Sequence, residues 1–401
     1  MTNYAQEEKI AILRGGDAEF VSAIPGVALF TMSAMSSFLF PVLTAMVNER
    51  MPIDASTFSI LAGIEGAGGI LAAGTAPFWI RRVAWRPVAI LSMVVLALGT
   101  IMTLFIGSVT QLMAVRLVMS VLGSGPAASL GIAALVRSRN PDKSFGYGAA
   151  GQSIIPSIFM FAASLSWLQN PNRLMPILAV VFAATSLLLL RLPSKPSQPT
   201  DGDQVTSGRI SLPGMTIVAC AACIVAAYMA YWAFSERIGR DAQLDPDNVS
   251  LLLSLSFFMS FIAGLGVAAV AGRWSRAWNF YIGVTLLTGS LVPVAIVNNP
   301  WTFALSVFGL NFFINVLNAV GLPALADIDK SGRIASATPA FQFIGATGGP
   351  LLAGPVVVAV GYNSSALVAI GFGFAALATF IFAIRRAGRL EISGPSIGYK
   401  V

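Results

Sequence analysis

The sequence predicts an all-α integral membrane protein with twelve transmembrane helices in two pseudo-symmetric six-helix bundles. Composition, the number of long apolar runs and a polar segment at the centre of the chain support this fold class. Of the 401 residues, 56% are hydrophobic and only 10% are charged, whereas soluble domains average about 25% charged residues. A chain of this composition is expected to place much of its surface in lipid.

Each predicted helix is an apolar run long enough to cross the roughly 30 Å hydrocarbon core of a bilayer. In the first half these runs are residues 20–46, 56–79, 87–106, 111–136, 145–168 and 174–190. In the second half they are residues 213–234, 249–271, 278–297, 301–326, 337–360 and 364–384. Residues 191–211 are rich in Pro, Ser and Gly and lack periodicity, which is typical of a linker.

Five segments follow from this division of the chain. The charged residues before Phe20 do not fit a cleavable secretory signal, so the first segment is predicted to be a soluble tail. The segments are an N-terminal tail (1–19), an N-terminal bundle (20–190), a linker (191–211), a C-terminal bundle (212–385) and a C-terminal tail (386–401).

Lys and Arg residues are distributed unevenly between the two sides of the predicted bundle. With a cytoplasmic amino terminus, 19 of them fall in inside segments and only four fall in outside loops. This bias predicts a bacterial inner (plasma) membrane protein with both termini in the cytoplasm. The net charge of +7 then reflects topology and attraction to lipid headgroups, because no clustered basic face indicates a nucleic-acid partner.

The two halves also share short sequence features. Asp142-Lys143-Ser144 and Asp329-Lys330-Ser331 lie 187 residues apart, each shortly before a predicted span that contains a glutamine, Gln152 or Gln342. Basic loops, WIRRVAWRP and GRWSRAW, follow the second and eighth spans. With twelve spans, a central linker and these loops, the chain resembles the major facilitator superfamily of secondary transporters over nearly its whole length.

The family's loop motifs are only partly present. The loop after the second span keeps Arg81, Arg82 and Arg86 but lacks the family's acid and glycine. In the fourth span Arg116 is followed by Gly123 and Gly125, which is similar to the family's motif with displaced spacing. The resemblance implies two bundles that rock about a central site, with no cofactor. It also implies a gating role for the three loop arginines.

Glu65 is the only carboxylate set deep in a membrane-length apolar stretch, and the chain contains no histidine. An ionised acid in hydrocarbon costs about 2.5–3.5 kcal/mol on insertion scales, so its presence predicts a use such as proton coupling. Small residues at Ala62, Gly66, Gly69 and Ala73 line one face of the same span and permit close helix approach. The resemblance implies that this span meets the eleventh across the moving boundary.

Arg116 is predicted to lie about 8 Å deep in the fourth span, against about 13 Å for Glu65 in the second. Its long side chain could therefore reach Glu65. Three interpretations stay open: a fixed ion pair, an anion-binding arginine for which a substrate carboxylate competes with Glu65, and a side chain that snorkels outward.

Three amides in the tenth span, Asn311, Asn315 and Asn318, are spaced by four and three residues and fall on one helical face. They predict a substrate-lined or water-filled cavity, although amides can also bond to neighbouring helices for about 0.6 kcal/mol each. Tyr228 and Trp232 share a face of the seventh span. They predict stacking on a flat substrate, or alternatively an interfacial aromatic belt.

Further polar residues complete the predicted machinery. Tyr147, Gln152 and Gln342 would add hydrogen-bonding groups from the fifth and eleventh spans. Glu236 and Arg237 follow the seventh span and are predicted to gate the outer end. Cys220 and Cys223 lie within one span and are interpreted as small helix residues, since two thiols make no metal site of four ligands.

These features predict a monomeric secondary transporter that couples inward proton flow to uptake of a small organic solute by alternating access. The substrate predicted from Arg116 and the aromatic residues is a hydrophobic or aromatic carboxylate. A proton-driven exporter of lipophilic drugs or cations is the alternative, and a non-transporting receptor or scaffold is a more remote one. An enzyme is not expected, because the sequence has no histidine, nucleophile constellation or phosphate-binding loop.

Overall fold

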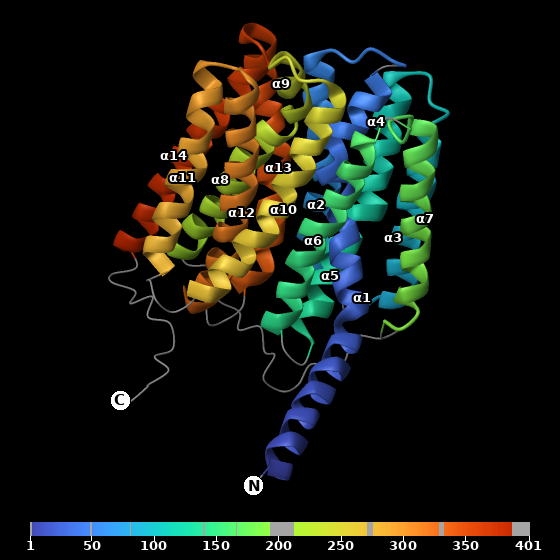
Figure 1. Cartoon of the computed structure of the whole chain (residues 1–401), viewed down its shortest axis with the longest axis vertical. Coiled ribbons are helices and arrows are strands. Elements are labelled where there is room, and N and C mark those ends of the chain that lie inside the picture. Colours follow the sequence, from blue (N-terminus) through green and yellow to red (C-terminus); the bar gives the residue numbers. More distant parts are fainter. Residues whose placement is uncertain are drawn as a thin grey trace.

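The computed structural model describes residues 2–48, 50–80, 82–138, 141–165, 167–192, 212–270, 276–328 and 333–386. Within these ranges the chain forms helices and short connections and contains no strand (Figure 1). The all-α fold class is thereby confirmed. Most of the predicted linker (193–211) and C-terminal tail (387–401), and Arg81 of the predicted inner gate, lie outside the described residues.

The N-terminal half contains six long helical segments. One of them changes from an α-helix to a π-helix and back without a break. The elements are α1 (Thr2–Asn48), α2 (Ala55–Trp79), α3 (Trp85–Met102), α4 (Val109–Val118), the π-helix η1 (Met119–Ser124), α5 (Gly125–Val136), α6 (Pro141–Ser164) and α7 (Pro171–Leu189).

The C-terminal half repeats this arrangement and adds one short helix that the sequence did not predict, α9. Its elements are α8 (Leu212–Trp232), α9 (Ser235–Asp241), α10 (Pro246–Val270), α11 (Arg276–Ile296), α12 (Pro300–Ile328), α13 (Arg333–Val360), the 3-10 helix η2 (Tyr362–Ser364) and α14 (Ser365–Arg386).

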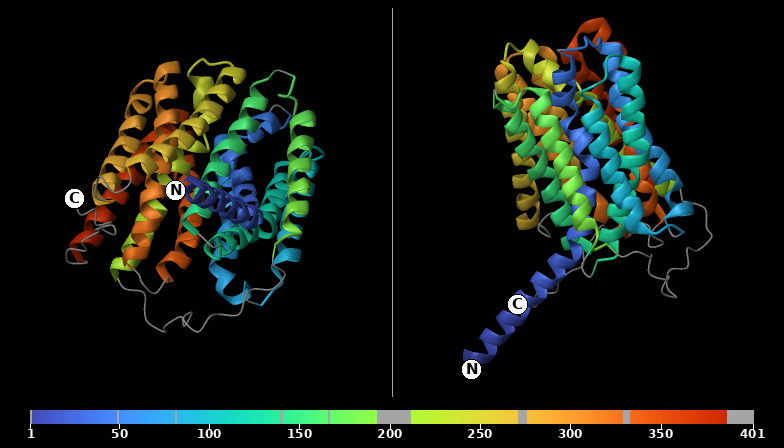
Figure 2. Two further views of the ribbon diagram at one scale, coloured as in Figure 1. Left: turned by 60° about the horizontal axis from the view of Figure 1, so that its bottom comes forward. Right: turned by 90° about the vertical axis from the view of Figure 1, so that its right-hand side faces the viewer.

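Eleven stretches of the described chain are long and apolar enough to cross a membrane. The twelfth long helix, α6, takes the place of the fifth predicted span, and its first residues are polar. The predicted spans and the observed helices therefore correspond one to one, with α4, η1 and α5 together forming the fourth. The first 19 residues, predicted as a tail, continue α1 as a helix that projects from the bundle in Figures 1 and 2.

Polar residues define where several helices begin. Asp54 accepts a hydrogen bond from the backbone N–H of Thr57 (2.8 Å) and caps α2. Ser108 and Asn170 cap α4 and α7 in the same way. Each cap satisfies a backbone donor that has no partner within its own helix.

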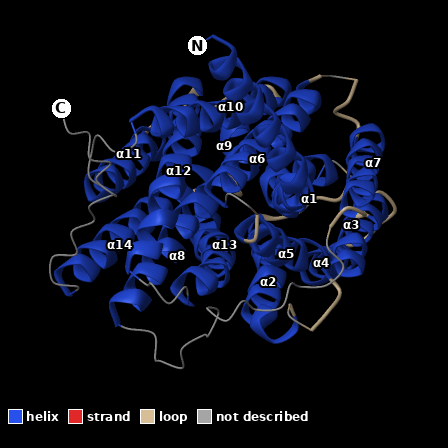
Figure 3. Ribbon diagram, turned by 90° about the horizontal axis from the view of Figure 1, so that it is seen from below, coloured by secondary structure: helices blue, strands red, loops and turns tan. Residues whose placement is uncertain are grey.

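The two halves lie side by side and meet along two helix pairs, α2 with α13 and α6 with α10 (Figure 3). Glycines allow the close approach of α2 to α13. A Cβ on Gly66 would lie 2.9 Å from the backbone N of Thr347, and a Cβ on Gly63 would lie 2.8 Å from Leu351. The predicted small-residue face of α2 is thus the face that meets the other half.

A different face of α2 packs on the N-terminal half itself. The Ser120 hydroxyl, in η1, donates to the carbonyl of Glu65 and accepts from the N–H of Gly68, both at 2.9 Å. The backbones are so close that a Cβ on Gly68 would overlap the backbone of Ser120. This contact fixes Glu65 and Gly68 against the π-helical turn, a type of irregularity that is frequent at functional sites.

Candidate functional site

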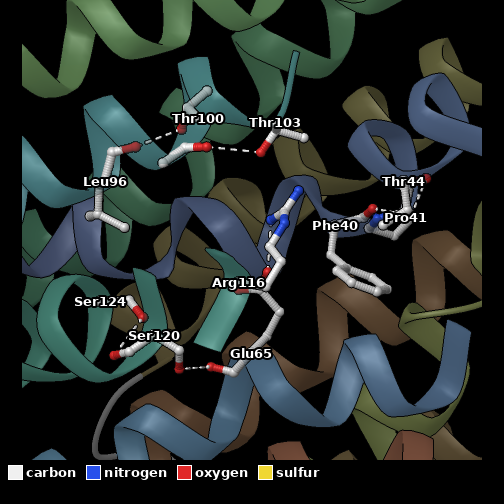
Figure 4. Close-up of polar contacts among 11 residues, drawn as sticks. Phe40, Pro41, Thr44, Glu65, Leu96, Thr100, Thr103, Arg116, Ser120 and Ser124 are labelled. Atoms are coloured by element: carbon white, nitrogen blue, oxygen red, sulfur yellow. Dashed lines mark hydrogen bonds and ion pairs between the residues drawn. The ribbon is translucent and has the colours of Figure 1, made fainter. Parts of the chain in front are cut away.

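Glu65 and Arg116 form an ion pair inside the N-terminal half. Arg116 Nη1 lies 2.7 Å from Glu65 Oε1, and the two side chains are 4% and 7% exposed, respectively (Figure 4). Of the three interpretations of Arg116, the structure contains the ion pair, and Arg116 does not snorkel outward. The predicted depths put Glu65 within reach of Arg116, and the structure decides between the interpretations that this left open.

The pair does not face the boundary between the halves. Gly66, the next residue of α2, faces α13, whereas Glu65 turns toward Arg116 in α4. A helix turns about 100° per residue, so neighbouring residues occupy different faces. Glu65 is therefore adjacent in sequence to a residue of the predicted moving interface, but its carboxylate points into the N-terminal bundle.

Tyr228, Trp232 and Asn311 lie together in the C-terminal half. The two aromatic rings are stacked on each other, with centroids 5.8 Å apart and planes 14° apart. Tyr228 donates from its hydroxyl to Asn311 Oδ1 (3.1 Å), and Asn311 Nδ2 donates to Ser256 Oγ (3.0 Å). The predicted shared face of Tyr228 and Trp232 exists, but in this conformation the rings contact each other.

Two polar contacts join the halves along α6. Asn315 Nδ2 donates to Ser153 Oγ (3.3 Å). The hydroxyl of Ser254 in α10 donates to the carbonyl of Ser157 in α6 (2.8 Å), and that of Ser157 donates to the carbonyl of Ser254 (2.9 Å). The sequence analysis missed these serines because Ser is common in membrane helices, although Ser153 and Ser157 are four residues apart and share a face of α6.

The remaining predicted substrate residues have different surroundings. Gln152 Nε2 donates to the carbonyl of Phe30 (3.1 Å) within the N-terminal half. Tyr147 is 39% exposed, and Gln342 is partly exposed on α13. The side chain of Asn318 lies outside the described residues. In the described part of the chain, no three His, Cys, Asp or Glu side chains gather in a group that could hold a metal ion.

Arg237 in α9 links the halves at one end of the bundle, called here the α9 end. It donates to the carbonyl of Ile53 (3.1 Å), in the α1–α2 connection, and to Oδ1 of Asn48 (3.4 Å), the last residue of α1. Its guanidinium lies over the ring of Phe58, 4.1 Å from the centroid, and donates to the Tyr362 hydroxyl (2.7 Å). Arg237 is only 9% exposed, so these contacts are largely shielded from water.

Aromatic residues continue this closure toward the centre of the protein. Trp232 Nε1 donates to the carbonyl of Phe38 in α1 (3.2 Å), and Phe38 packs edge-on against Phe257 in α10. Phe58 of α2 packs against Phe234. Each contact joins one half to the other. These five rings, called here the ring layer, therefore close the α9 end on the interior side of Arg237.

The other predicted gating residues lie apart from this layer or at the opposite end. Glu236 pairs with Arg240 one turn along α9. Arg82 is exposed, and Arg86 Nε donates to the carbonyl of Leu192 (3.1 Å) within the N-terminal half. Among the described contacts of Arg82 and Arg86, none joins the two halves.

Two carboxyl groups at the α9 end have shifted pKa values of opposite sign. The hydrogen bonds from Thr57 lower the pKa of Asp54 below its ordinary value. Partial burial raises the pKa of Asp241, and the nearby charge of Arg237 opposes that shift. Asp54 is thus stabilised in its ionised form, whereas Asp241 is destabilised in that form.

No protein-family model matches the chain, and no curated protein matches its sequence. Its structure is similar to that of a nucleoside transporter, NupG, at a TM-score of 0.68 and 14% identity, over 90% of this chain and 99% of that one. It is similar to that of a D-xylose-proton symporter at a TM-score of 0.68 and 12% identity, over 91% and 97%. The chain has the major facilitator fold. With eleven apolar stretches of spanning length, it is an integral membrane protein.

The major facilitator fold explains the arrangement of the polar contacts. The two halves are held together by the α2–α13 pair, to which Gly66 of α2 belongs, and by the α6–α10 pair, to which Ser157 of α6 belongs. Arg237 and the ring layer join the halves at the α9 end, whereas the pair of Glu65 and Arg116 lies within one half. Any separation of the halves would have to break the contacts between them, whereas a contact within one half could persist.

Proposed function

We propose that this protein is a secondary active transporter that couples inward proton flow to uptake of a small organic solute by alternating access. The buried pair of Glu65 and Arg116 is the observation that carries the proton-coupling part of this proposal. The similarity in fold to a D-xylose-proton symporter and a nucleoside transporter supports the transport part. The α9 end would face outward and both termini would be cytoplasmic in the plasma membrane, in keeping with the bias of Lys and Arg.

Glu65 is the proposed proton carrier because the other acid in the candidate spans, Asp247, lies in the first turn of its helix. Arg116 Nη1 donates to Glu65 Oε1, and a protonated Glu65 no longer carries the charge that pairs with Arg116. Breaking a buried pair leaves one charge without compensation, at a cost of about 3–5 kcal/mol. Such a cost links protonation to a change in structure, which is what a coupled transporter requires.

The substrate that the geometry supports best is an uncharged solute with several hydrogen-bonding groups. The described polar side chains along the inter-half contacts of α6, α10 and α12 are neutral: Ser153, Ser157, Ser254 and Asn315. A hydrophobic or aromatic carboxylate, favoured by the sequence, would need Arg116 to leave Glu65 and reach the solute. Arg116 is only 3% exposed within the N-terminal half, which supports the uncharged substrate over the carboxylate.

Uptake into proteoliposomes with an imposed pH gradient tests the proposal. The solutes are a pentose, a nucleoside, an aromatic carboxylate and a lipophilic cation, and the variants are Glu65→Gln and the double variant Glu65→Gln with Arg116→Gln. The double variant leaves no unpaired buried charge, which guards against simple misfolding. Asp247→Asn is the matched control, because it removes a carboxylate from the end of a span.

Both Gln variants are expected to lose gradient-driven accumulation, by at least about tenfold, while they retain solute counterflow without a gradient. Asp247→Asn is expected to accumulate solute like wild type. Accumulation at the wild-type level in Glu65→Gln would show that Glu65 does not couple protons. If lipophilic cations are extruded and no solute accumulates, the exporter is correct; if no solute moves at all, the receptor or scaffold is favoured.

A further inference from the structure

A small cavity lies beside Arg116, on the interior of the N-terminal half. Its volume is about 10 Å³, close to the minimum that accommodates one water molecule. All its lining residues are at least 94% buried. They come from α1, α3 and its C-terminal cap Thr103, α4, η1 and α7, and are Ser36, Leu43, Thr100, Thr103, Arg116, Met119, Met175 and Leu178.

Arg116 brings an unsatisfied donor to this cavity. Its Nη1 bonds to Glu65, but its Nε–H is fully buried and has no hydrogen-bond partner among the residues that the structure describes. Buried polar groups without a partner are rare in native proteins, and each one calls for an acceptor. Methionine and leucine side chains, which form much of the remaining wall, cannot supply a strong one.

The hydroxyls of Ser36, Thr100 and Thr103 line the cavity, and the two threonines supply acceptors whose own donated bonds are described. Thr100 donates its hydroxyl hydrogen to the carbonyl of Leu96 (2.7 Å), and Thr103 donates to the carbonyl of Gly99 (2.8 Å). Each hydroxyl oxygen keeps a lone pair that can accept a hydrogen bond. Figure 4 shows Thr100 and Thr103 on one side of the Arg116 guanidinium in that view, with Glu65 on the other.

We propose that this cavity is a binding site for one ordered water molecule, which accepts a hydrogen bond from Arg116 Nε–H and donates to the hydroxyls of Thr100 and Thr103. The three protein groups satisfy three of the water's four hydrogen-bonding positions, which is typical of buried water. The size of the cavity excludes an organic ligand. The net neutrality of the adjacent ion pair disfavours an anion.

This water also gives the site a role in coupling, a step that rests on the proposed function. When Glu65 takes up a proton, Arg116 loses its carboxylate partner and remains a buried cation. The water and the two hydroxyls then solvate the guanidinium within the bundle, so the pair can open without exposing Arg116 to lipid. Thr100 and Thr103 are positioning residues in this scheme and do not touch the transported solute.

Hydroxyl-radical labelling with short X-ray pulses tests the water site directly in the full-length protein, because radicals formed from bound water oxidise adjacent side chains. Met119 and Met175 line the cavity and serve as reporters. Met93 and Met160 are equally buried but do not line it, so they are the internal controls. Labelling of the reporters several-fold above the controls would support the site, and labelling equal to the controls would overturn it.

The variants Thr100→Val and Thr103→Val, made together, remove the two acceptors while keeping the shape of the side chains. Thr185→Val is the matched control, because Thr185 makes the same type of bond to the preceding turn, to Val181 (2.8 Å), in the same half. Reporter labelling is expected to fall to the control level in the double variant and to stay at the wild-type level in Thr185→Val. Unchanged labelling in the double variant would contradict the assignment of the acceptors.

The transport readout separates this inference from the proposed function. In the double threonine variant, gradient-driven uptake is expected to fall at least about fivefold relative to counterflow. An unchanged ratio would refute the coupling role of the water while leaving the labelling result intact. If wild type itself shows no proton-coupled transport, the proposed function fails, and the labelling still decides whether the water is present.

Discussion

Arg237→Gln is expected to shift the protein toward a conformation that is open at the α9 end. Arg237 contacts the opposite half through hydrogen bonds to the carbonyl of Ile53 and to Asn48 Oδ1, and through the ring of Phe58. Its bond to Tyr362 lies within the C-terminal half and should survive opening. Only the contacts with the opposite half therefore favour closure over opening.

The size of the shift follows from the Ile53 bond and the Phe58 contact, because the bond to Asn48, at 3.4 Å, is longer than a typical hydrogen bond. A hydrogen bond from a charged donor contributes about 1.5–3 kcal/mol, and a cation–π contact shielded from water contributes about 1–2 kcal/mol. Allowing for the weaker bonds that Gln can still make, the loss is about 3 kcal/mol. Because every 1.4 kcal/mol is a factor of ten in an equilibrium constant, the ratio of open to closed protein should rise about 100-fold.

Distances between spin labels measure this ratio. Phe105 and Trp301 are both more than 80% exposed and lie in different halves near the α9 end, so they are replaced by labelled cysteines after Cys220 and Cys223 are changed to Ala. Arg237→Gln is expected to add a longer distance that is minor or absent in wild type.

The control for this experiment comes from the same short helix. Arg240 is 40% exposed on its side chain and pairs with Glu236 within α9. Arg240→Gln should therefore leave the distance distribution unchanged. If Arg237→Gln and Arg240→Gln give the same distribution as wild type, Arg237 does not hold the α9 end closed.

Three further predictions concern stability, each measured by thermal unfolding in detergent. Gly66→Ala should cost about 1–3 kcal/mol, because its Cβ would press on α13, whereas Gly74→Ala has open space and should gain about 0.5–1 kcal/mol; equal effects would contradict the close packing. Asp54→Ala should lower the unfolding temperature at pH 6, and this difference should shrink as the pH falls through the lowered pKa of the folded state, because a protonated Asp54 no longer gains from the cap. At pH values above the raised pKa of Asp241, Asp241→Asn should raise the unfolding temperature, because the variant has no carboxylate that burial destabilises. This advantage should disappear below pH 3.8, the ordinary pKa; a lower unfolding temperature at pH 7 would contradict the direction of the pKa shift.

Much of the fold could be predicted because it depends on local properties of the sequence. The requirement that a helix cross a hydrocarbon layer sets the length of each apolar run, so the runs and the observed helices correspond. The small α9 helix was missed because seven residues carry too little periodicity to distinguish a helix from a polar loop.

The π-helix η1 explains why the motif after Arg116 has displaced spacing. A π-helical turn contains an additional residue, which rotates every later side chain relative to a regular α-helix. In the structure a Cβ on Gly125 would lie 2.6 Å from the carbonyl oxygen of Gly68, so this glycine permits close packing on α2. The sequence showed the displacement but gave no reason for it.

The sequence by itself determined that the protein spans a membrane, that its helices form two sets of six, and that Glu65 is an exceptional acid. Those conclusions depend on composition and on position along one helix. Only the tertiary structure decided that Glu65 turns from the inter-half face toward Arg116, that Tyr228 and Trp232 stack on each other, and that Arg237 joins the halves. Such contacts depend on the rotation of each helix about its axis and on the neighbour that it meets, and packing between distant segments fixes both.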